Sequence, residues 1–322
     1  MSRILTAAIG GVLLLAQAAF PVFAADTWPS RPIKLVVPFS PGGSTDITAR
    51  VLADGLRPVL GQTVLVENRP GASGNIAGDA VAKSAPDGYT FLVSSATLVV
   101  NISLYKNLPY DYVQDLAPVS QTHFSTNVLV VSPNLPVANL AEFIAYVKSG
   151  KPVNYGTAGL GSSQHLAAAL FNNMVAGNMV HVPYKGGAPA TTALLGGEIQ
   201  TIFAPLIEVL AHIRAGTIKA LGVCGKKRSP LVPDAPMISD LLPGYEMTSW
   251  NGILAPAKTP ADIVNKLSEA IVKVLNQPSV KAHFAEADKE QVGSSPAEFK
   301  QFIATEVERL RMQVRISGAK VD

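Results

Sequence analysis

The sequence predicts an α/β protein made of two lobes with a ligand cleft between them. Short β-branched runs alternate with turns of Gly, Pro and Ser and with helical apolar periods, which is the pattern of a largely parallel sheet covered by helices. This alternation occurs in two sets, one beginning at Lys34 and the other at Asn127. A length of 322 residues also suits about two domains.

The first set opens with a strand that runs into a Gly-rich turn. Residues 33–39 form the strand, residues 41–45 form the turn, and a helix with regularly spaced apolar residues follows. Pro58 should end or kink this helix in its last turn, because proline lacks the amide proton that a helix uses. The remaining elements of this set are a strand at 64–67, a helix at 76–82 and a strand at 90–94.

The second set repeats the pattern. Its helix after the second Gly-rich turn carries Leu166, Leu170 and Met174 four residues apart on one face. Proline at helix starts and glycine at helix ends support the boundaries. The other expected elements are strands at 128–131, 153–155, 198–203 and 218–223 and helices at 140–148, 189–195 and 205–214.

The C-terminal part is helical, with amphipathic segments at 260–275 and 296–316. It contains too few strands for a sheet of its own, so we expect it to complete the first lobe. We therefore assign residues 25–123 and 247–322 to lobe 1 and residues 124–246 to lobe 2. Two crossings of the chain, near residues 124 and 247, predict a hinge that lets the cleft close on a ligand.

The N-terminus resembles a secretory signal peptide. Arg3 is followed by an apolar run from Ile4 to Phe20, and Val22-Phe23-Ala24 has the residues of a cleavage site. A transmembrane anchor is the alternative, but the run is interrupted by glycine, glutamine and proline and is shorter than the ~20 residues that span a bilayer. We expect cleavage near Ala24, export to the periplasm and a soluble mature chain.

Charge and cysteine content narrow the class of function. Removing residues 1–24, which contain Arg3, leaves 25 basic and 23 acidic residues, a net charge of +2. Such a weak charge, without a long basic run, argues against nucleic acid as a partner. Cys224 is the single cysteine, so no intramolecular disulfide can form, and its apolar context predicts a buried, inert thiol.

Each set contains a Gly-rich turn with hydroxyl groups at the start of a helix. The turns are Pro41-Gly42-Gly43-Ser44-Thr45-Asp46 and Gly159-Leu160-Gly161-Ser162-Ser163-Gln164-His165. Unpaired amides and a partial positive charge at helix starts suit an anion, and crevices at strand carboxyl ends are the usual ligand sites of open α/β sheets. The alternative is that Ser44 or Asp46, and Ser162, only cap their helices. If helix ends and hydroxyls hold the anion, affinity should change little between about pH 6 and 8.

Other chemistries lack their motifs. The turns do not have the spacing of a dinucleotide fingerprint or a P-loop, and Gly71-Ala72-Ser73-Gly74 is one residue short of a nucleophile elbow. The five histidines show no paired helical spacing, so we expect neither a metal nor another cofactor. His165, at a helix start, could touch the ligand or pack behind the site.

Several ordered motifs resemble one family of receptors over essentially the whole mature chain. They are Trp28-Pro29-Ser30-Arg31-Pro32-Ile33, Val37 to Asp46, Val66-Glu67-Asn68-Arg69-Pro70-Gly71-Ala72, Ala85-Pro86-Asp87-Gly88-Tyr89-Thr90, Leu108-Pro109-Tyr110-Asp111, Gly159 to Leu166, Val182-Pro183-Tyr184-Lys185-Gly186, Leu194-Leu195-Gly196-Gly197 and His212-Ile213-Arg214-Ala215-Gly216. With them the chain resembles the solute-binding receptors of tripartite tricarboxylate transporters, the Bug family.

The resemblance implies a type II periplasmic-binding-protein fold and two pocket loops that hold a ligand carboxylate through backbone amides, hydroxyls and ordered waters, without an arginine. From the two crossings of the chain we also expect a monomer whose lobes close by hinge bending. It also implies delivery to two integral membrane transporter subunits. One departure is Ala204-Pro205, where many relatives have Asp or Asn, and this disfavours an amino-acid ligand because its buried ammonium would lack a partner. We expect the ligand to contact Phe39, Gly42, Gly43, Ser44, Thr45, Ser95 and Thr97 from lobe 1, and Thr157, Gly161, Ser162, Ser163, His165, Ala204 and Pro205 from lobe 2.

Two other functions stay open at this point. A receptor that presents a carboxylate to a sensor kinase would have the same cleft, and the sequence carries no motif for the docking surface. An enzyme would need an acid, base or nucleophile in the cleft, and only His165 and Asp46 are available there. We therefore predict a mono- or dicarboxylate receptor that is not an enzyme.

Overall fold

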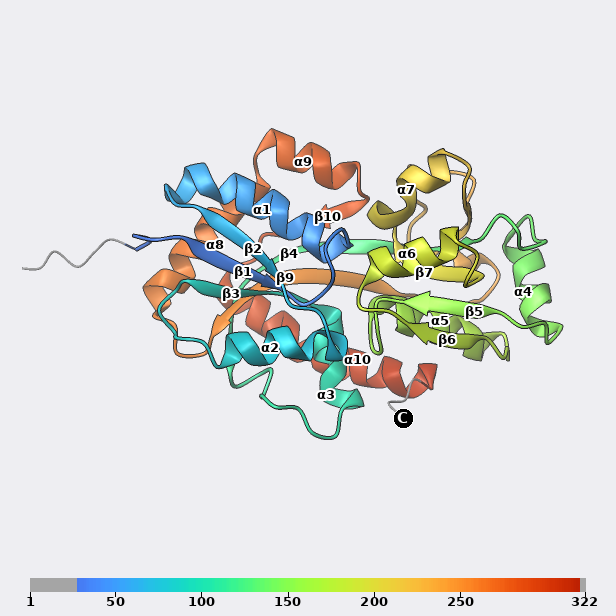
Figure 1. The fold of residues 1–322 in the computed structure, drawn as a ribbon, viewed down its shortest axis with the longest axis horizontal. Helices are drawn as coiled ribbons and strands as arrows, with labels where there is room; N and C mark the ends of the chain where they lie inside the picture. Colours follow the sequence, from blue (N-terminus) through green and yellow to red (C-terminus); the bar gives the residue numbers. More distant parts are fainter. Residues whose placement is uncertain (1–27, 319–322) are drawn as a thin grey trace, which may run out of the picture.

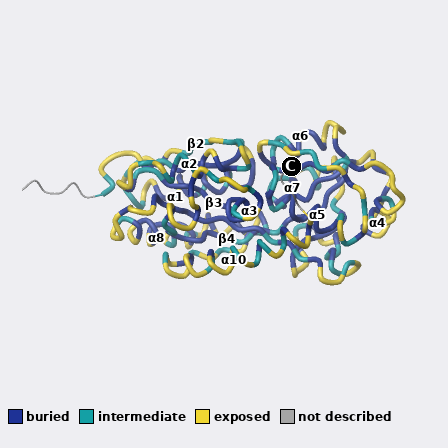
Figure 2. Tube along the Cα trace, turned by 90° about the horizontal axis from the view of Figure 1, so that it is seen from below, coloured by how far each residue is buried: buried dark blue, intermediate teal, exposed yellow. Residues whose placement is uncertain are grey.

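The computed structural model describes residues 28–318. The predicted signal peptide and its cleavage point lie outside the described residues. Two lobes lie side by side along the long axis of the molecule (Figure 1). Buried segments run through the interior of both lobes, with exposed segments around them (Figure 2). The predicted two-lobed α/β architecture is confirmed.

Lobe 1, the part built around the first three strands, follows the predicted alternation closely. Its sheet has hydrophobic side chains on both faces: Leu35 faces α1 and α8, while Val36 faces α2 and the C-terminal helix. In chain order its first elements are β1 (Ile33–Val37), α1 (Ser44–Leu60), β2 (Val64–Asn68), the 3-10 turn η1 (Ala72–Gly74), α2 (Asn75–Ala82), β3 (Thr90–Ser95) and α3 (Ala96–Leu104). Pro58 lies in the last turn of α1, as predicted, and the helix ends at Gly61 in the left-handed conformation.

Lobe 2, the part built around β5 to β8, has the same layered construction. Helices α6 and α7 cover one face of its sheet and α4 and α5 cover the other. Its elements are α4 (Leu140–Lys148), β5 (Asn154–Thr157), α5 (Ser163–Met174), β6 (Val180–Pro183), α6 (Gly187–Leu195), β7 (Thr201–Pro205), α7 (Leu206–Arg214), β8 (Lys219–Val223) and the 3-10 turn η2 (Ile238–Asp240). Strand β7 begins three residues later than the expected strand at 198–203, since residues 196–200 form the turn after α6.

Two long antiparallel strands connect the lobes. Strand β4 (Leu116–Val131) enters lobe 2 and β9 (Thr248–Pro256) returns from it. Strand β4 pairs with β9 over residues 116–126 and with β7 and β8 over residues 127–131. The strands of the mixed sheet lie in the order β2-β1-β3-β9-β4-β7-β5-β6, with β8 and β10 also paired to β4.

The sequence predicted only the last four residues of β4 and no strand at β9. The missed part of β4, residues 116–127, carries a polar run, Ser120 to His123, whose members are at most 3 % exposed. Hydrogen bonds within the protein satisfy part of this run: the Thr122 hydroxyl donates to the Asn251 carbonyl, and the Gln121 amide donates to the Ser294 hydroxyl. A buried polar strand lacks the hydrophobic pattern on which strand prediction depends.

The C-terminal segment completes lobe 1 and reaches lobe 2. It contains α8 (Ala261–Leu275), α9 (Pro278–Ala285), β10 (Lys289–Gln291) and α10 (Pro296–Ser317). Helix α10 runs beneath both lobes (Figure 1) and contacts α3 and α5. One continuous hydrophobic cluster therefore joins the lobes on this side, from Leu92 in β3 to Phe171 in α5.

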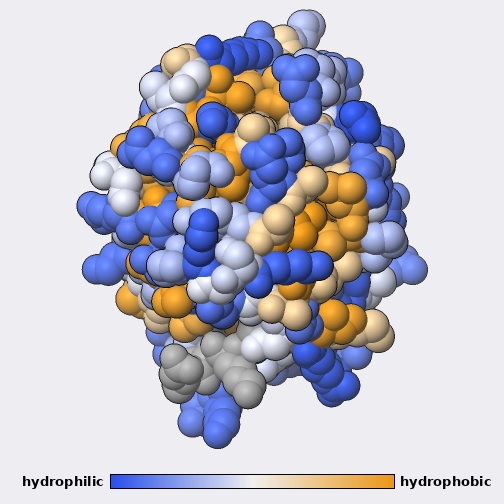
Figure 3. Space-filling model, turned by 90° about the vertical axis from the view of Figure 1, so that its right-hand side faces the viewer, coloured by the Kyte–Doolittle hydropathy of each residue, from blue (hydrophilic) through white to orange (hydrophobic). Residues whose placement is uncertain are grey.

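The exposed surface at the far end of lobe 2 is mixed. Apolar side chains lie there in small groups between hydrophilic ones (Figure 3). Within residues 28–318, the helices are all too short or too polar to cross a bilayer.

We predict that packing of α10 on β9 tolerates no side chain at Gly252. A methyl group on Gly252 would lie 2.2 Å from Cζ of Phe299. Gly252→Ala should lower the free energy of unfolding by about 1–3 kcal/mol, because overpacking forces a shift of ring or strand. Urea unfolding measures this. As a control, Gly196→Ala has ordinary space and a φ of −73°, and should change stability by less than about 0.5 kcal/mol. Equal stability of the two variants would contradict the prediction.

Candidate functional site

A cavity of about 40 Å³ lies between the lobes, where the carboxyl ends of strands from both sheets meet. Nine of the predicted site residues line it: Phe39, Gly43, Ser44, Thr45, Ser95, Thr97, Ser162, Ser163 and Pro205. Five do not: Gly42, Thr157, Gly161, His165 and Ala204. The polar residues that sequence reasoning missed are Ser125, Gln164, Glu208, Ser249 and Asn251.

Helix α1 begins at the cavity without a side-chain cap. Its N-cap is Gly43 and its first residue is Ser44, so Ser44 does not cap the helix. The Ser44 hydroxyl is buried without a hydrogen-bond partner, and the same holds for the Ser95 hydroxyl at the end of β3. Both residues are at least nine-tenths buried. The lobe 1 wall of the cavity therefore offers two unused hydroxyls beside a helix start.

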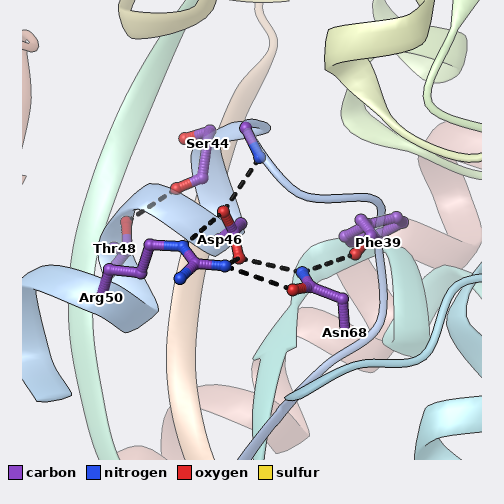
Figure 4. Close-up of polar contacts among 7 residues, drawn as sticks. Phe39, Ser44, Asp46, Thr48, Arg50 and Asn68 are labelled. Carbon is purple, nitrogen blue, oxygen red and sulfur yellow. Dashed lines mark hydrogen bonds and ion pairs between the residues drawn. The ribbon is translucent and has the colours of Figure 1, made fainter. Parts of the chain in front are cut away.

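Asp46 braces the turn that leads into α1, and Figure 4 shows its contacts. One carboxylate oxygen accepts hydrogen bonds from the Gly42 amide (2.9 Å) and Arg50 Nε (2.9 Å), and the other accepts from Asn68 Nδ2 (2.9 Å). Asn68 Nδ2 also donates to the Phe39 carbonyl. Burial raises the pKa of Asp46, but the hydrogen bonds from Arg50, Gly42 and Asn68 together lower that pKa below its ordinary value. Asp46 is thus an ionised support of the turn.

Helix α5 has a true cap. The Ser162 hydroxyl accepts a hydrogen bond from the His165 amide at 3.1 Å, so the capping alternative holds for this serine. Ser162 also lines the cavity, which makes capping and ligand contact compatible. Its neighbours in the first turn, Ser163 and Gln164, line the cavity as well.

His165 supports this turn from behind. Its Nδ1 accepts a hydrogen bond from the Gly161 amide at 3.0 Å, and its ring stacks on His181 with 4.2 Å between ring centroids. Burial and the neighbouring His181 lower the pKa of His165 to about 3, so the ring is neutral at physiological pH. Thr157 supports the same turn, because its hydroxyl accepts from the Gly159 amide. These residues shape the site without lining the cavity.

Glu208 is the most important residue that sequence reasoning missed. It lies in the first turn of α7, and its Oε1 accepts a hydrogen bond from the Ser44 amide at 2.7 Å, across the cleft. Its Oε2 accepts from Gln164 Nε2 at 2.9 Å. Burial raises the pKa of Glu208 to about 7, although the Ser44 amide, the field of Lys289 and Gln164 act against the rise. A carboxylate from lobe 2 therefore occupies the start of a helix in lobe 1.

Ala204 does not lie where the sequence analysis expected it. It is fully buried in β7 and lies off the cavity, so it is not among the residues that line the site. An acid does line the cavity four residues after Ala204, as Glu208. The signal available in the sequence was an acid in the first turn of a helix that follows a strand into the cleft.

Gln164 and Asn251 complete the polar lining. Gln164 is 2 % exposed, and its Oε1 has no hydrogen-bond partner. Asn251 Nδ2 donates to the Thr45 hydroxyl and to the Ser94 carbonyl, which fixes the side chain of Thr45 at the cavity wall. Within the described part of the chain, His, Cys, Asp and Glu side chains form no group of three that could hold a metal ion.

The lobes are in contact at the mouth of the cleft. The Ser40 amide and hydroxyl both donate to the Lys185 carbonyl, at 3.1 and 2.9 Å. A methyl group on Gly186 would lie 3.1 Å from the Ser40 nitrogen. A second cavity of about 260 Å³ lies outside these contacts and shares Phe39 and Ala158 with the inner one. The cleft is closed, with a small inner chamber and a larger outer one.

Cys224 is fully buried, as predicted from its apolar surroundings. Burial raises the pKa of its thiol to about 12, and the Tyr245 hydroxyl lies 3.5 Å from the sulfur. A protonated thiol in this position is a packing residue of lobe 2.

Comparisons with known proteins agree on one family. A family model described as "Tripartite tricarboxylate transporter family receptor" matches residues 48–318. Protein BugT of Bordetella pertussis is 41% identical over 326 residues, covering 100% of this chain and 99% of BugT. A solved R. palustris protein with adipate has a TM-score of 0.88 at 35% identity, covering 91% of this chain and 100% of that one. MatC from Rhodopseudomonas palustris with bound malate has a TM-score of 0.85 at 31% identity, covering 89% of this chain and 100% of MatC.

We predict that the Asp46 support stabilises the protein in a pH-dependent way. Because the pKa of Asp46 is lowered in the folded state, its contribution is present above the ordinary carboxyl pKa of about 4 and is lost as pH falls through the folded value. Asp46→Asn should cost about 1–3 kcal/mol of unfolding free energy at pH 7. The difference in unfolding free energy between Asp46→Asn and wild type should become smaller below about pH 4.

Urea unfolding at several pH values measures both effects. Asp54→Asn is the matched control in the same helix, because Asp54 is exposed and its contact with Arg57 is 4.0 Å long. Its effect should stay within about 0.5 kcal/mol. If the difference in unfolding free energy between Asp46→Asn and wild type did not vary with pH, the prediction that ionised Asp46 stabilises the turn would be contradicted.

Proposed function

The chain belongs to the tripartite tricarboxylate transporter family of receptors, and we propose that it captures a small carboxylate between its lobes and delivers it to membrane subunits of such a transporter. The family is one of periplasmic solute-binding receptors. The mono- or dicarboxylate specificity, the monomeric state and the delivery step are our proposal for this chain.

The observation that carries the proposal is the pairing of two helix starts across the cleft. Helix α1 contributes first-turn amides and the unpartnered Ser44 hydroxyl, and α5 contributes its first turn at Ser163 and Gln164. Helix starts carry a partial positive charge and favour anions. The Ser95 hydroxyl, at the end of β3, also lines this cavity. Donors from three elements therefore line the same small cavity. A carboxylate has two oxygens that can accept from several such donors at once.

The dimensions of the cavity support a movement of the lobes on binding. About 40 Å³ has room for about three water molecules, which is too little for a diacid. We propose that β4 and β9 act as the hinge near residues 124 and 247, so that the cleft opens to admit ligand. The outer chamber, beyond Phe39, would then accept the rest of a ligand whose carboxylate lies in the inner one.

Support for a carboxylate comes also from relatives. Two similar solved structures contain adipate and malate. Both are dicarboxylates without an amino group. Delivery to a sensor kinase stays the second candidate for the partner, and genomic neighbours that encode a kinase in place of transporter subunits would favour it.

We predict that Ser44 contacts the carboxylate. A hydroxyl that donates to an ionised group contributes ~1.5–3 kcal/mol, so Ser44→Ala should weaken binding by about 10- to 150-fold. Calorimetry with malate, succinate, adipate and benzoate would measure this. Ser44→Ala is a cleaner test than Ser162→Ala, because the Ser162 hydroxyl also caps α5 and its loss costs about 1 kcal/mol of stability.

The control is Ser149→Ala, because Ser149 is exposed at the end of α4 and bonds only locally in the structure. This variant should bind as wild type does. Wild-type affinity in a correctly folded Ser44→Ala protein would remove the start of α1 from the site. Failure of wild type to bind any carboxylate of the panel, after unfolding and refolding to remove bound ligand, would contradict the proposed function.

A further inference from the structure

We propose that Glu208 is a resident carboxylate that holds the empty receptor closed and competes with the carboxylate of the ligand. This inference rests on the proposed function, since it assigns Glu208 to the same anion position. It goes beyond that function, because the competitor belongs to the protein itself and acts when no ligand is present.

The contacts of Glu208 are those of a bound anion. Its Oε1 accepts from the Ser44 amide at the start of α1, and its Oε2 accepts from Gln164 at the start of α5. A ligand carboxylate between the same helix starts would need the same donors. The Ser44 contact also joins the lobes, because Glu208 comes from α7 in lobe 2 and Ser44 from lobe 1.

The backbone around the carboxylate is shaped to admit it. A methyl group on Gly187, at the start of α6, would lie 2.0 Å from Oε2 of Glu208. A methyl group on Gly43 would lie 3.4 Å from Oε1. Glycine therefore stands on both sides of the Glu208 carboxylate, and any other residue at position 187 would displace it.

Glu208 and the ligand carboxylate compete for this position because both carry a negative charge. An ionised Glu208 and a ligand carboxylate in one buried chamber repel each other, and two carboxylates at one site cannot both ionise at ordinary pH. The ligand must therefore displace Glu208 or bind when it is protonated. The pKa of Glu208, raised to about 7 by burial, places this change within the physiological range.

The other charged groups near Glu208 come from the elements packed around it. Lys289 on β10 acts on Glu208 through its field, and its Nζ donates to the Thr48 hydroxyl on α1 at 2.7 Å. Burial lowers the pKa of Lys289 to about 7, and Glu208 acts against that change. Asp46 on α1 is paired with Arg50, and His165 on α5 is neutral. Lys289 is thus the second group whose titration must be separated from that of Glu208.

The first experiment needs no ligand. Wild type, Glu208→Ala and the control Glu198→Ala, whose side chain is exposed in the same lobe, are unfolded in guanidinium, dialysed and refolded to remove any bound solute. Small-angle scattering at pH 8 should give the same compact radius of gyration for wild type and Glu198→Ala, and a larger one for Glu208→Ala. Equal radii for wild type and Glu208→Ala would overturn the proposal.

The second experiment measures the affinity of adipate and of malate by calorimetry at pH 6 and pH 8. If ligand binds only the protein with Glu208 protonated, wild type should bind about tenfold more weakly at pH 8 than at pH 6. This differs from the nearly constant affinity expected from helix ends and hydroxyls alone, because that expectation did not include Glu208. Glu208→Gln should lose this dependence and bind more tightly than wild type at pH 8. Lys289→Met should keep a fall in affinity with rising pH, shifted to higher pH, because the field of Lys289 no longer lowers the pKa of Glu208.

The outcomes separate the two proposals. A pH dependence that survives in Glu208→Gln and disappears in Lys289→Met would assign the titration to Lys289 and overturn competition by Glu208. Weaker binding of both diacids by Glu208→Gln at both pH values would also overturn it, because Glu208 would then be a favourable ligand contact. If neither diacid binds any variant, the carboxylate function loses support, while the scattering comparison still decides whether Glu208 closes the empty protein.

Discussion

The closed cleft places two helix starts in a space from which water is largely excluded, and their first-turn amides must find acceptors there. Buried amides without a partner are costly, so a closed structure is stable only if something accepts from them. In this structure the Ser162 hydroxyl accepts from the His165 amide, Asp46 accepts from the Gly42 amide, and Glu208 accepts from the Ser44 amide. Two of these acceptors are local to their turns. The third acceptor, Glu208, comes from the opposite lobe. The position of the lobes relative to each other therefore depends on which group accepts a hydrogen bond from the Ser44 amide at the start of α1.

The same requirement explains the polar interior of the strands between the lobes. Residues 120–123 of β4 are almost fully buried, yet they are Ser, Gln, Thr and His. Thr122 donates to the carbonyl of Asn251 in β9, and Asn251 in turn donates to Thr45 and to the Ser94 carbonyl. Burial lowers the pKa of His123 well below its ordinary value, so this ring adds no charge to the interior. A chain of hydrogen bonds thus runs from β4 through β9 to the first turn of α1, where the cavity lies.

The sequence was informative where a single local rule decides the structure. Gly-rich turns between a strand and a helix located the starts of α1 and α5, and nine residues from the expected site line one cavity.

The sequence was uninformative where contacts between distant segments decide the structure. The polar half of β4 is a strand because β9 and β10 pair with it, and neither pairing leaves a pattern in residues 116–126. Glu208 looked like an ordinary first-turn acid of α7, and only the approach of the second lobe places it on Ser44. His165 was expected at the ligand or behind it, and packing against His181 places it behind.

The order of the strands also bears on how the protein folds during synthesis. In lobe 1, β3 pairs with β9, about 160 residues later in the chain, and α10 closes the hydrophobic cluster from the last residues described. Lobe 2 lies between β4 and β9 as one continuous segment. Contacts between distant segments form slowly, because the intervening chain must be ordered first. Strand β1 can pair early with β2 and β3, but the free edge of β3 and the sheet faces that α8 and α10 cover stay exposed until the C-terminal segment has been synthesised.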